Sequence, residues 1–104
     1  RICELVREAA LELVRDEMPH SLAVTLDEIV EGEQKQTLHV SLWVERDSQK
    51  GIVIGKAGSM LKTIGTKARR EIEELLGSPI HLAIQVRIAK DWQRDSKQLG
   101  KLGF

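Results

Sequence analysis

The chain has 104 residues, of which 41% are hydrophobic and 31% charged, and this size fits one globular domain with a single core. It contains no apolar run near the roughly 20 residues of a membrane-spanning helix. The single cysteine, Cys3, excludes an internal disulfide, and the three histidines lack the spacing of a zinc site. The sequence begins at Arg1 in the middle of a helical pattern, so we expect it to be part of a longer protein.

The net charge is zero, but the charges are unevenly distributed. Residues 1–34 contain three basic and nine acidic side chains, whereas residues 46–70 contain seven basic and one acidic. The seven basic residues are Arg46, Lys50, Lys56, Lys62, Lys67, Arg69 and Arg70. A polyanion responds to the local field rather than to the total charge, so this stretch is compatible with nucleic-acid binding. A solvated helix face is the commoner explanation of such a run.

The first half of the chain predicts one helix and two strands. Apolar residues recur at helical spacing over residues 2–17, and Pro19 is expected to end this helix. Residues 22–30 form a less regular strand candidate. Residues 37–45 alternate strictly between apolar and polar side chains, which predicts a half-buried strand.

The second half predicts two helices, a strand and a terminal helix. Asp47 or Ser48 is expected to cap a short helix that residues 55–58 interrupt. The next helix is expected to end at Gly77, with Gly65 marking a kink. Its predicted apolar stripe consists of Leu61, Ile64, Ala68, Ile72 and Leu75.

Pro79 opens a third strand, in which the apolar residues of 80–88 alternate with polar ones, and residues 91–104 predict a short helix folded back on the body. The strands at 37–45 and 80–88 each offer one apolar face, so we expect helices on one side of the sheet only. This pattern predicts an α+β domain of two layers. The other sheet face would then carry polar side chains and Trp43.

The most informative segment is Gly-Ile-Val-Ile-Gly-Lys-Ala-Gly, residues 51–58. Gly55 and Gly58 have no Cβ, so a phosphodiester chain can approach their backbone closely. We expect unpaired amides at the start of the following helix to favour an anion, with Lys56 adding a positive charge. A KH domain works in this way, because its Gly-x-x-Gly loop clamps about four nucleotides of a single strand.

Two alternatives use the same residues differently. The glycines can form a purely structural turn in a protein-interaction domain. A nucleotide-binding loop is disfavoured, because three residues rather than four separate Gly51 from Gly55, and Ala57 stands where Ser or Thr would bind magnesium. We therefore expect that this chain is not an enzyme and neither binds nor hydrolyses GTP.

The order of elements resembles a type II KH domain, and several stretches of the sequence resemble the C-terminal KH domain of the Era family of ribosome-assembly GTPases. The matching stretches are residues 17–21, 23–24, 44–58, 60–65, 68–69, 90–92 and 102–104. The sequence departs from the family at Ala57, where lysine is frequent, at Gln93, where arginine is frequent, and at Phe104, where tyrosine is usual.

The resemblance implies that residues 1–104 form a single type II KH domain, with a three-stranded sheet, helices on one face and the order αββααβ plus a short C-terminal helix. It implies a parent whose N-terminal GTPase domain, absent here, holds GTP and magnesium, while this chain holds no cofactor. The implied partners are single-stranded RNA, the 3′ end of small-subunit ribosomal RNA in the 30S particle, and the parent's own GTPase domain. The implied location is the bacterial cytoplasm, with peripheral contact at the inner membrane, and we expect a monomer.

The predicted RNA-binding residues are the loop and its flanks. They are Arg46, Lys50, Ile52, Ile54, Gly55, Lys56, Ala57, Gly58, Met60 and Lys62. The isoleucines would form a floor for bases, while Lys56 and the loop amides would hold the backbone. Arg69 and Arg70 either line the RNA path or serve solubility, and Trp43 either stacks a base or packs on the sheet.

Overall fold

The computed structural model describes residues 1–14 and 22–89. Its elements are α1 (Ile2–Val14), β1 (Ala23–Val30), β2 (Gln36–Val44), α2 (Asp47–Ile54), the 3-10 turn η1 (Lys56–Gly58), α3 (Ser59–Leu76) and β3 (Ile80–Ile88). This succession confirms the predicted order αββααβ. The predicted helix end at Pro19 and the predicted tail helix over residues 91–104 lie outside the described residues.

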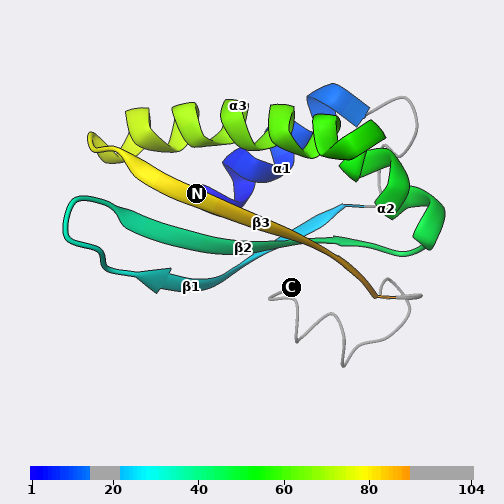
Figure 1. The fold of residues 1–104 in the computed structure, drawn as a ribbon, viewed down its shortest axis with the longest axis horizontal. Helices are drawn as coiled ribbons and strands as arrows, with labels where there is room; N and C mark the ends of the chain where they lie inside the picture. The colour runs from blue at the N-terminus through cyan, green and yellow to red at the C-terminus, as the bar shows by residue number, and fades with distance from the viewer. Residues whose placement is uncertain (15–21, 90–104) are drawn as a thin grey trace.

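The three strands form one sheet in the order β1-β2-β3. β1 and β2 are an antiparallel hairpin, whereas β2 and β3 run parallel, so α2 and α3 form the crossover between them. All the described helices lie on one face of this sheet, as Figure 1 shows, which confirms the predicted two-layer arrangement. β3 is therefore an edge strand that lies beneath α3.

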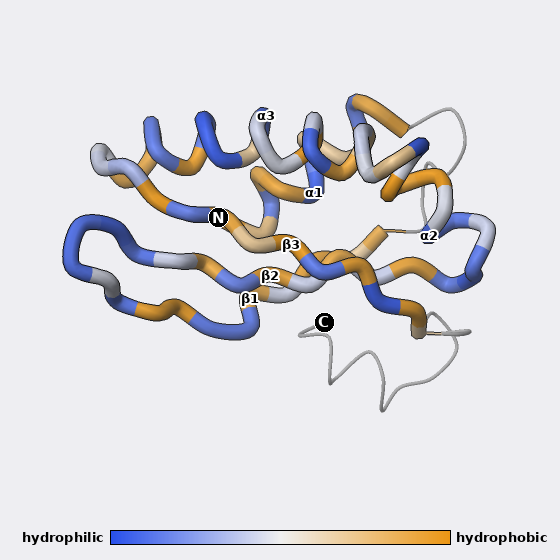
Figure 2. The backbone as a smooth tube through the Cα atoms, viewed as in Figure 1, coloured by the Kyte–Doolittle hydropathy of each residue, from blue (hydrophilic) through white to orange (hydrophobic). Residues whose placement is uncertain are grey.

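The core lies between the sheet and the helices. The alternation in β2 places Leu38, Val40, Leu42 and Val44 on the helix side, where each is at most 1% exposed. α1 and α3 present their apolar stripes to the same core and also pack against each other. Figure 2 shows the division in α3, whose outer surface is hydrophilic and whose inner surface is hydrophobic.

Trp43 lies on the opposite face of the sheet, within a polar network that joins all three strands. A bulge in β1 between Leu26 and Glu28 accommodates Asp27, whose carboxylate accepts a hydrogen bond from Ser41. The Arg87 Nε donates to Ser41 Oγ at 2.9 Å, and its guanidinium lies 5.9 Å from the centre of the Trp43 ring.

The start of α2 differs from the expected capping. The N-cap is Arg46, with extended dihedrals, rather than Asp47 or Ser48. The side-chain oxygen of Gln49 accepts hydrogen bonds from the backbone amides of Glu45, at 2.9 Å, and Arg46, at 3.1 Å. Gln49 therefore supplies the side-chain acceptor that the sequence predicts at Asp47 or Ser48. Asp47 lies in the first turn of α2, where the helix dipole favours a carboxylate.

Two expectations for α3 are wrong. The helix runs without interruption from Ser59 to Leu76, so Gly65 marks no break in it. Leu75 is 48% exposed, because the helix extends beyond the part of the core that would cover it. The predicted stop is confirmed, since Gly77 adopts the left-handed conformation and donates to the Glu73 carbonyl.

Candidate nucleic-acid interface

The loop between α2 and α3 contains three residues with positive φ. Gly55, at 76°, and Gly58, at 77°, adopt it without steric cost, whereas Ala57, at 54°, lies in the left-handed region that costs an alanine about 1–2 kcal/mol. Lys56 and Ala57 are both exposed at the tip of the loop. The chain thus turns sharply between two helices and presents these two side chains to solvent.

The lack of a side chain has a different consequence at each of the two loop glycines. A Cβ at Gly55 would lie 2.6 Å from the Cβ of Met60 and 2.8 Å from its backbone nitrogen, so only glycine allows the loop to pack against the start of α3. A Cβ at Gly58 would meet nothing within 4 Å. The first glycine serves the fold, and the second leaves an open surface beside the loop.

The loop amides are less free than expected. Gly58 donates to the Gly55 carbonyl at 3.1 Å, and the Ser59 amide donates to the Lys56 carbonyl. These amides, which we expected to be unpaired, close a 3-10 turn that bridges the two helices. Binding of an anion at this loop therefore depends more on the Lys56 side chain than on the amides at the start of α3.

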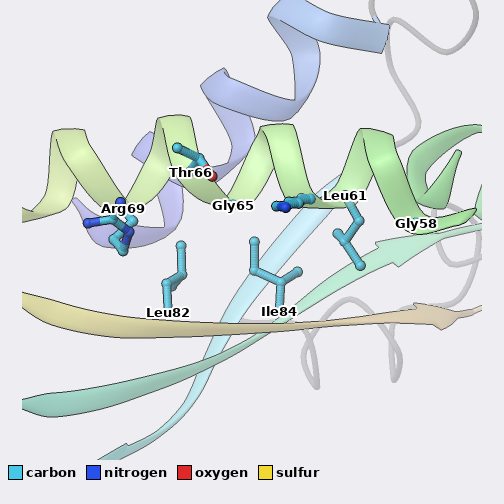
Figure 3. Close-up of a pocket in the computed structure, with 8 residues that line it drawn as sticks. Gly58, Leu61, Gly65, Thr66, Arg69, Leu82 and Ile84 are labelled. Atoms are coloured by element: carbon cyan, nitrogen blue, oxygen red, sulfur yellow. The ribbon is translucent and has the colours of Figure 1, made fainter.

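An open groove of about 400 Å³ begins at Gly58 and follows α3 along β3, as Figure 3 shows. Its lining consists of Gly58, Leu61, Lys62, Gly65, Thr66, Arg69, Leu82 and Ile84. The leucines and the isoleucine make an apolar floor, and polar side chains of α3 lie along one wall. Such a surface can take flat apolar rings on its floor and charged or polar groups at its margin.

Gly65 keeps the middle of this groove open. A Cβ there would meet only Ile84 Cδ1, at an ordinary contact distance of 3.8 Å, so the helix tolerates a side chain at this position. The absence of that side chain leaves the Ile84 side chain accessible from the groove, as the close-up in Figure 3 shows. The glycine therefore favours an open groove at the expense of helix stability.

We expect Gly65→Ala to raise stability and to weaken ligand binding in the groove. Replacing a glycine inside a helix by alanine contributes about 0.5–1 kcal/mol to folding, while the added methyl group fills part of the floor. Gly51→Ala is a matched control, because Gly51 lies within α2 and its Cβ would contact nothing within 4 Å. Thermal melts should show both variants stabilised, and only Gly65→Ala should lose binding in titrations. Equal binding by the two variants would show that the groove middle is unused.

The cations of this region divide into paired and unpaired groups. Lys67 is bound to Glu12 of α1 at 3.0 Å and to Glu71 at 3.5 Å. The pKa of Lys67 is raised because Glu12 accepts its hydrogen bond and attracts its charge, with Glu71 adding to both effects. Lys56 and Lys62 have no carboxylate within 4.0 Å among the described residues. Lys56 at the loop and Lys62 in the groove are therefore available to an anionic ligand.

The structure brings together only part of the predicted site. Of the ten predicted residues, Gly58 and Lys62 line the groove. Lys56 and Ala57 are exposed beside it, and Arg46 and Lys50 belong to the start of α2. Ile52, Ile54 and Met60 are half-buried against the core and do not line the groove. The floor comes instead from Leu61 and from β3.

Sequence reasoning missed Leu61, Gly65, Thr66, Leu82 and Ile84 as groove residues. The spacing from Gly58 through Leu61 and Gly65 to Arg69 follows one helix face, which is a readable signal. The contribution of β3 had no such signal, since the sequence does not reveal which strand lies beneath α3. Trp43, on the far face of the sheet, does not line this groove.

Residues 1–14 and 22–89 contain neither a membrane-spanning helix nor a metal-binding cluster. No helix in these ranges is long and apolar enough to span a membrane. No three His, Cys, Asp or Glu side chains of the same ranges come together in a way that could hold a metal ion.

The KH domain family model matches residues 17–93. The chain is 61% identical over 99% of its length to GTPase Era of Mycolicibacterium smegmatis, and 58% identical over 99% to GTPase Era of Mycobacterium tuberculosis. It spans about a third of the length of these curated relatives, 36% and 35% respectively.

Two solved structures are similar in fold and sequence. One is an Aquifex aeolicus Era variant bound to GDP·AlF4⁻, and the other is Era in complex with MgGDPNP and nucleotides 1506–1542 of 16S ribosomal RNA. Each superposes with a TM-score of 0.92 at 38% identity, covering 98% of this chain and 35% of the solved one. The chain therefore belongs to the KH domain family, and the relatives that it resembles over nearly its whole length are Era GTPases.

Proposed function

We propose that this chain binds single-stranded RNA in the groove between α3 and β3, with the Gly55–Gly58 loop holding the RNA backbone. The observation that carries this proposal is the continuity of the loop with the groove. Gly58 belongs to both, and from it an apolar floor runs beneath α3. The solved Era complex with a 16S ribosomal RNA fragment, whose fold matches this chain, supports RNA binding.

The base and the ribose-phosphate backbone of a nucleotide occupy different parts of the groove. Unstacked bases lie on the floor of Leu61, Leu82 and Ile84, which removes their apolar faces from water. The ribose-phosphate backbone passes the open side of Gly58, where Lys56 and Lys62 meet its charges. A duplex does not fit this use of the groove, because its bases are stacked and paired.

We further propose that the parent protein is an Era-type GTPase and that its RNA is the 3′ end of small-subunit ribosomal RNA in the 30S particle. The identity to Era proteins supports this proposal, as does the length of those relatives, which leaves room for a GTPase domain. GTP and magnesium would then belong to that other domain. The proposed location in the bacterial cytoplasm, with contact at the inner membrane, rests on the resemblance alone.

The test is a titration of fluorescent single-stranded RNA with this chain at several salt concentrations, beside a duplex of the same sequence. We expect preference for the single strand and an affinity that falls with salt, by about 0.7 in the log–log slope for each phosphate neutralised. Equal, weak binding of both RNAs would favour a protein-interaction domain with a structural Gly-x-x-Gly turn.

A further inference from the structure

Arg69 lies at the end of the groove away from the loop, and a carboxylate holds its guanidinium in place. Its Nη1 donates to Glu73 Oε1 at 2.8 Å, one helical turn along α3. The other oxygen, Glu73 Oε2, accepts from the backbone amide of Ile80, the first residue of β3, at 2.9 Å. The Glu73 side chain is only 23% exposed. One carboxylate therefore fixes both the arginine and the start of the strand beneath it.

Arg69 lies beneath α3 at the end of the groove where Leu82 rises from β3, as Figure 3 shows, and both residues line the groove. It lies eleven residues along α3 from Gly58, which corresponds to about 16 Å of helix. The guanidinium has five N–H donors, and Glu73 takes one of them, so further donors remain for a ligand on the floor.

Pairing with Glu73 changes which ligand this arginine suits. The ion pair is neutral as a unit, so it attracts a phosphate less than the unpaired Lys56 and Lys62 do. The donors of the held guanidinium keep their direction, and a fixed fork of donors favours directional hydrogen bonds to neutral acceptors. The loop end of the groove is thus built for charge, and the Arg69 end for hydrogen bonding.

We propose that Arg69, positioned by Glu73, determines base specificity at the end of the groove distant from the loop. This inference rests on the proposed RNA binding. A planar fork of donors matches a base edge with two neighbouring acceptors, such as O6 and N7 of guanine or N3 and O2 of cytosine. Adenine and uracil place a donor beside each acceptor on these edges. Arg69 therefore selects guanine or cytosine at one position of the bound strand.

The experiment is selection from a pool of RNA hexamers randomised at all six positions, followed by sequencing. The wild-type chain, Arg69→Ala, Arg69→Lys and Glu73→Gln are compared. Arg70→Ala is the matched control, since Arg70 is the neighbouring arginine of the same helix, is exposed and does not line the groove. Circular dichroism melts verify the fold of each variant, and Glu73→Gln retains an oxygen that can accept from Ile80.

We expect the wild type and Arg70→Ala to enrich guanine or cytosine at one position by about tenfold. Arg69→Ala and Arg69→Lys should lose this preference at that position while keeping the others, because lysine has no planar fork. Glu73→Gln should reduce it, since a neutral amide holds the guanidinium less firmly. The salt dependence of binding should stay the same in Arg69→Ala, Arg69→Lys and Arg70→Ala.

The outcomes separate this inference from the function on which it rests. If the wild type enriches no RNA, the proposed function fails. If the wild type binds and Arg69→Ala keeps every base preference, base reading by Arg69 is wrong and RNA binding stands. If Arg69→Ala weakens all sequences equally and lowers the salt slope by about 0.7, the arginine contacts a phosphate instead.

Discussion

Replacing Lys56 and Ala57 together by aspartate should abolish RNA binding and leave the domain folded. The substitution removes Lys56, the unpaired lysine of the loop, and places two negative charges where the RNA backbone must pass. Like charges at an interface cost several kcal/mol, so we expect affinity to fall at least about 100-fold. The fold should tolerate the change, because both side chains are exposed and aspartate adopts the left-handed conformation of residue 57 more readily than alanine.

The matched control is Lys56→Asn with Ala57→Asn, which has the same shape without the added charges. Asparagine also tolerates the left-handed region, so this variant should fold like the aspartate pair and lose only the contact made by Lys56. Anisotropy titrations with single-stranded RNA measure binding, and circular dichroism melts on the same samples measure stability. A folded aspartate pair that binds RNA like the wild type would leave the loop with a structural role only.

Removal of α1 should prevent the rest of the chain from folding. The helix buries Leu5, Val6 and Val14 to at most 8% exposure, together with two alanines. Each large buried side chain contributes about 1.5–3 kcal/mol, against about 5–15 kcal/mol for the net stability of a whole domain. Deletion of residues 1–14 also exposes the stripe of α3 that packs on α1. We expect the cooperative thermal transition to disappear.

A point substitution tests the same contact in the full chain. Val6→Asp places an unpaired carboxylate at a fully buried position, whereas Glu8→Ala changes an exposed residue two positions away. Val6→Asp should unfold or melt far below the wild type, and Glu8→Ala should melt within a few degrees of it. A shortened chain that melts cooperatively near the wild-type temperature would show that the sheet, α2 and α3 form a sufficient core.

Much of the fold was predictable, because each strand and helix carries its own periodicity. The alternation in β2 and the middle of the α3 stripe, at Ile64, Ala68 and Ile72, identify side chains that face the core. Gly77 marks a helix end through its backbone freedom. The cap of α2 was not predictable in the same way. Asp47 and Ser48 both have side chains that could cap the helix. Gln49 is the acceptor instead because of where the backbone amides of Glu45 and Arg46 lie at the end of β2.

The candidate site was predictable at the loop and not along the groove. The glycine spacing identifies Gly55–Gly58, but the apolar residues next to it in sequence, Ile52 and Ile54, do not line the groove. The residues that make the groove floor, Leu82 and Ile84, are separated from the loop by the whole of α3. Local patterns cannot reveal this, since the contact depends on strand order and on the parallel direction of β3.

The parallel pairing of β2 with β3 also bears on the order in which the domain assembles. Each residue of β2 pairs with the residue forty-four positions later, whereas β1 and β2 meet across a short hairpin. The entropy of closing the longer segment must be overcome before β3 pairs, so the hairpin is expected to form early and β3 to dock late. β3 supplies part of the groove floor, so a folding intermediate that lacks this strand has no RNA site. A nascent chain therefore acquires RNA binding as one of its last folding steps, after nearly all of the domain has been synthesised.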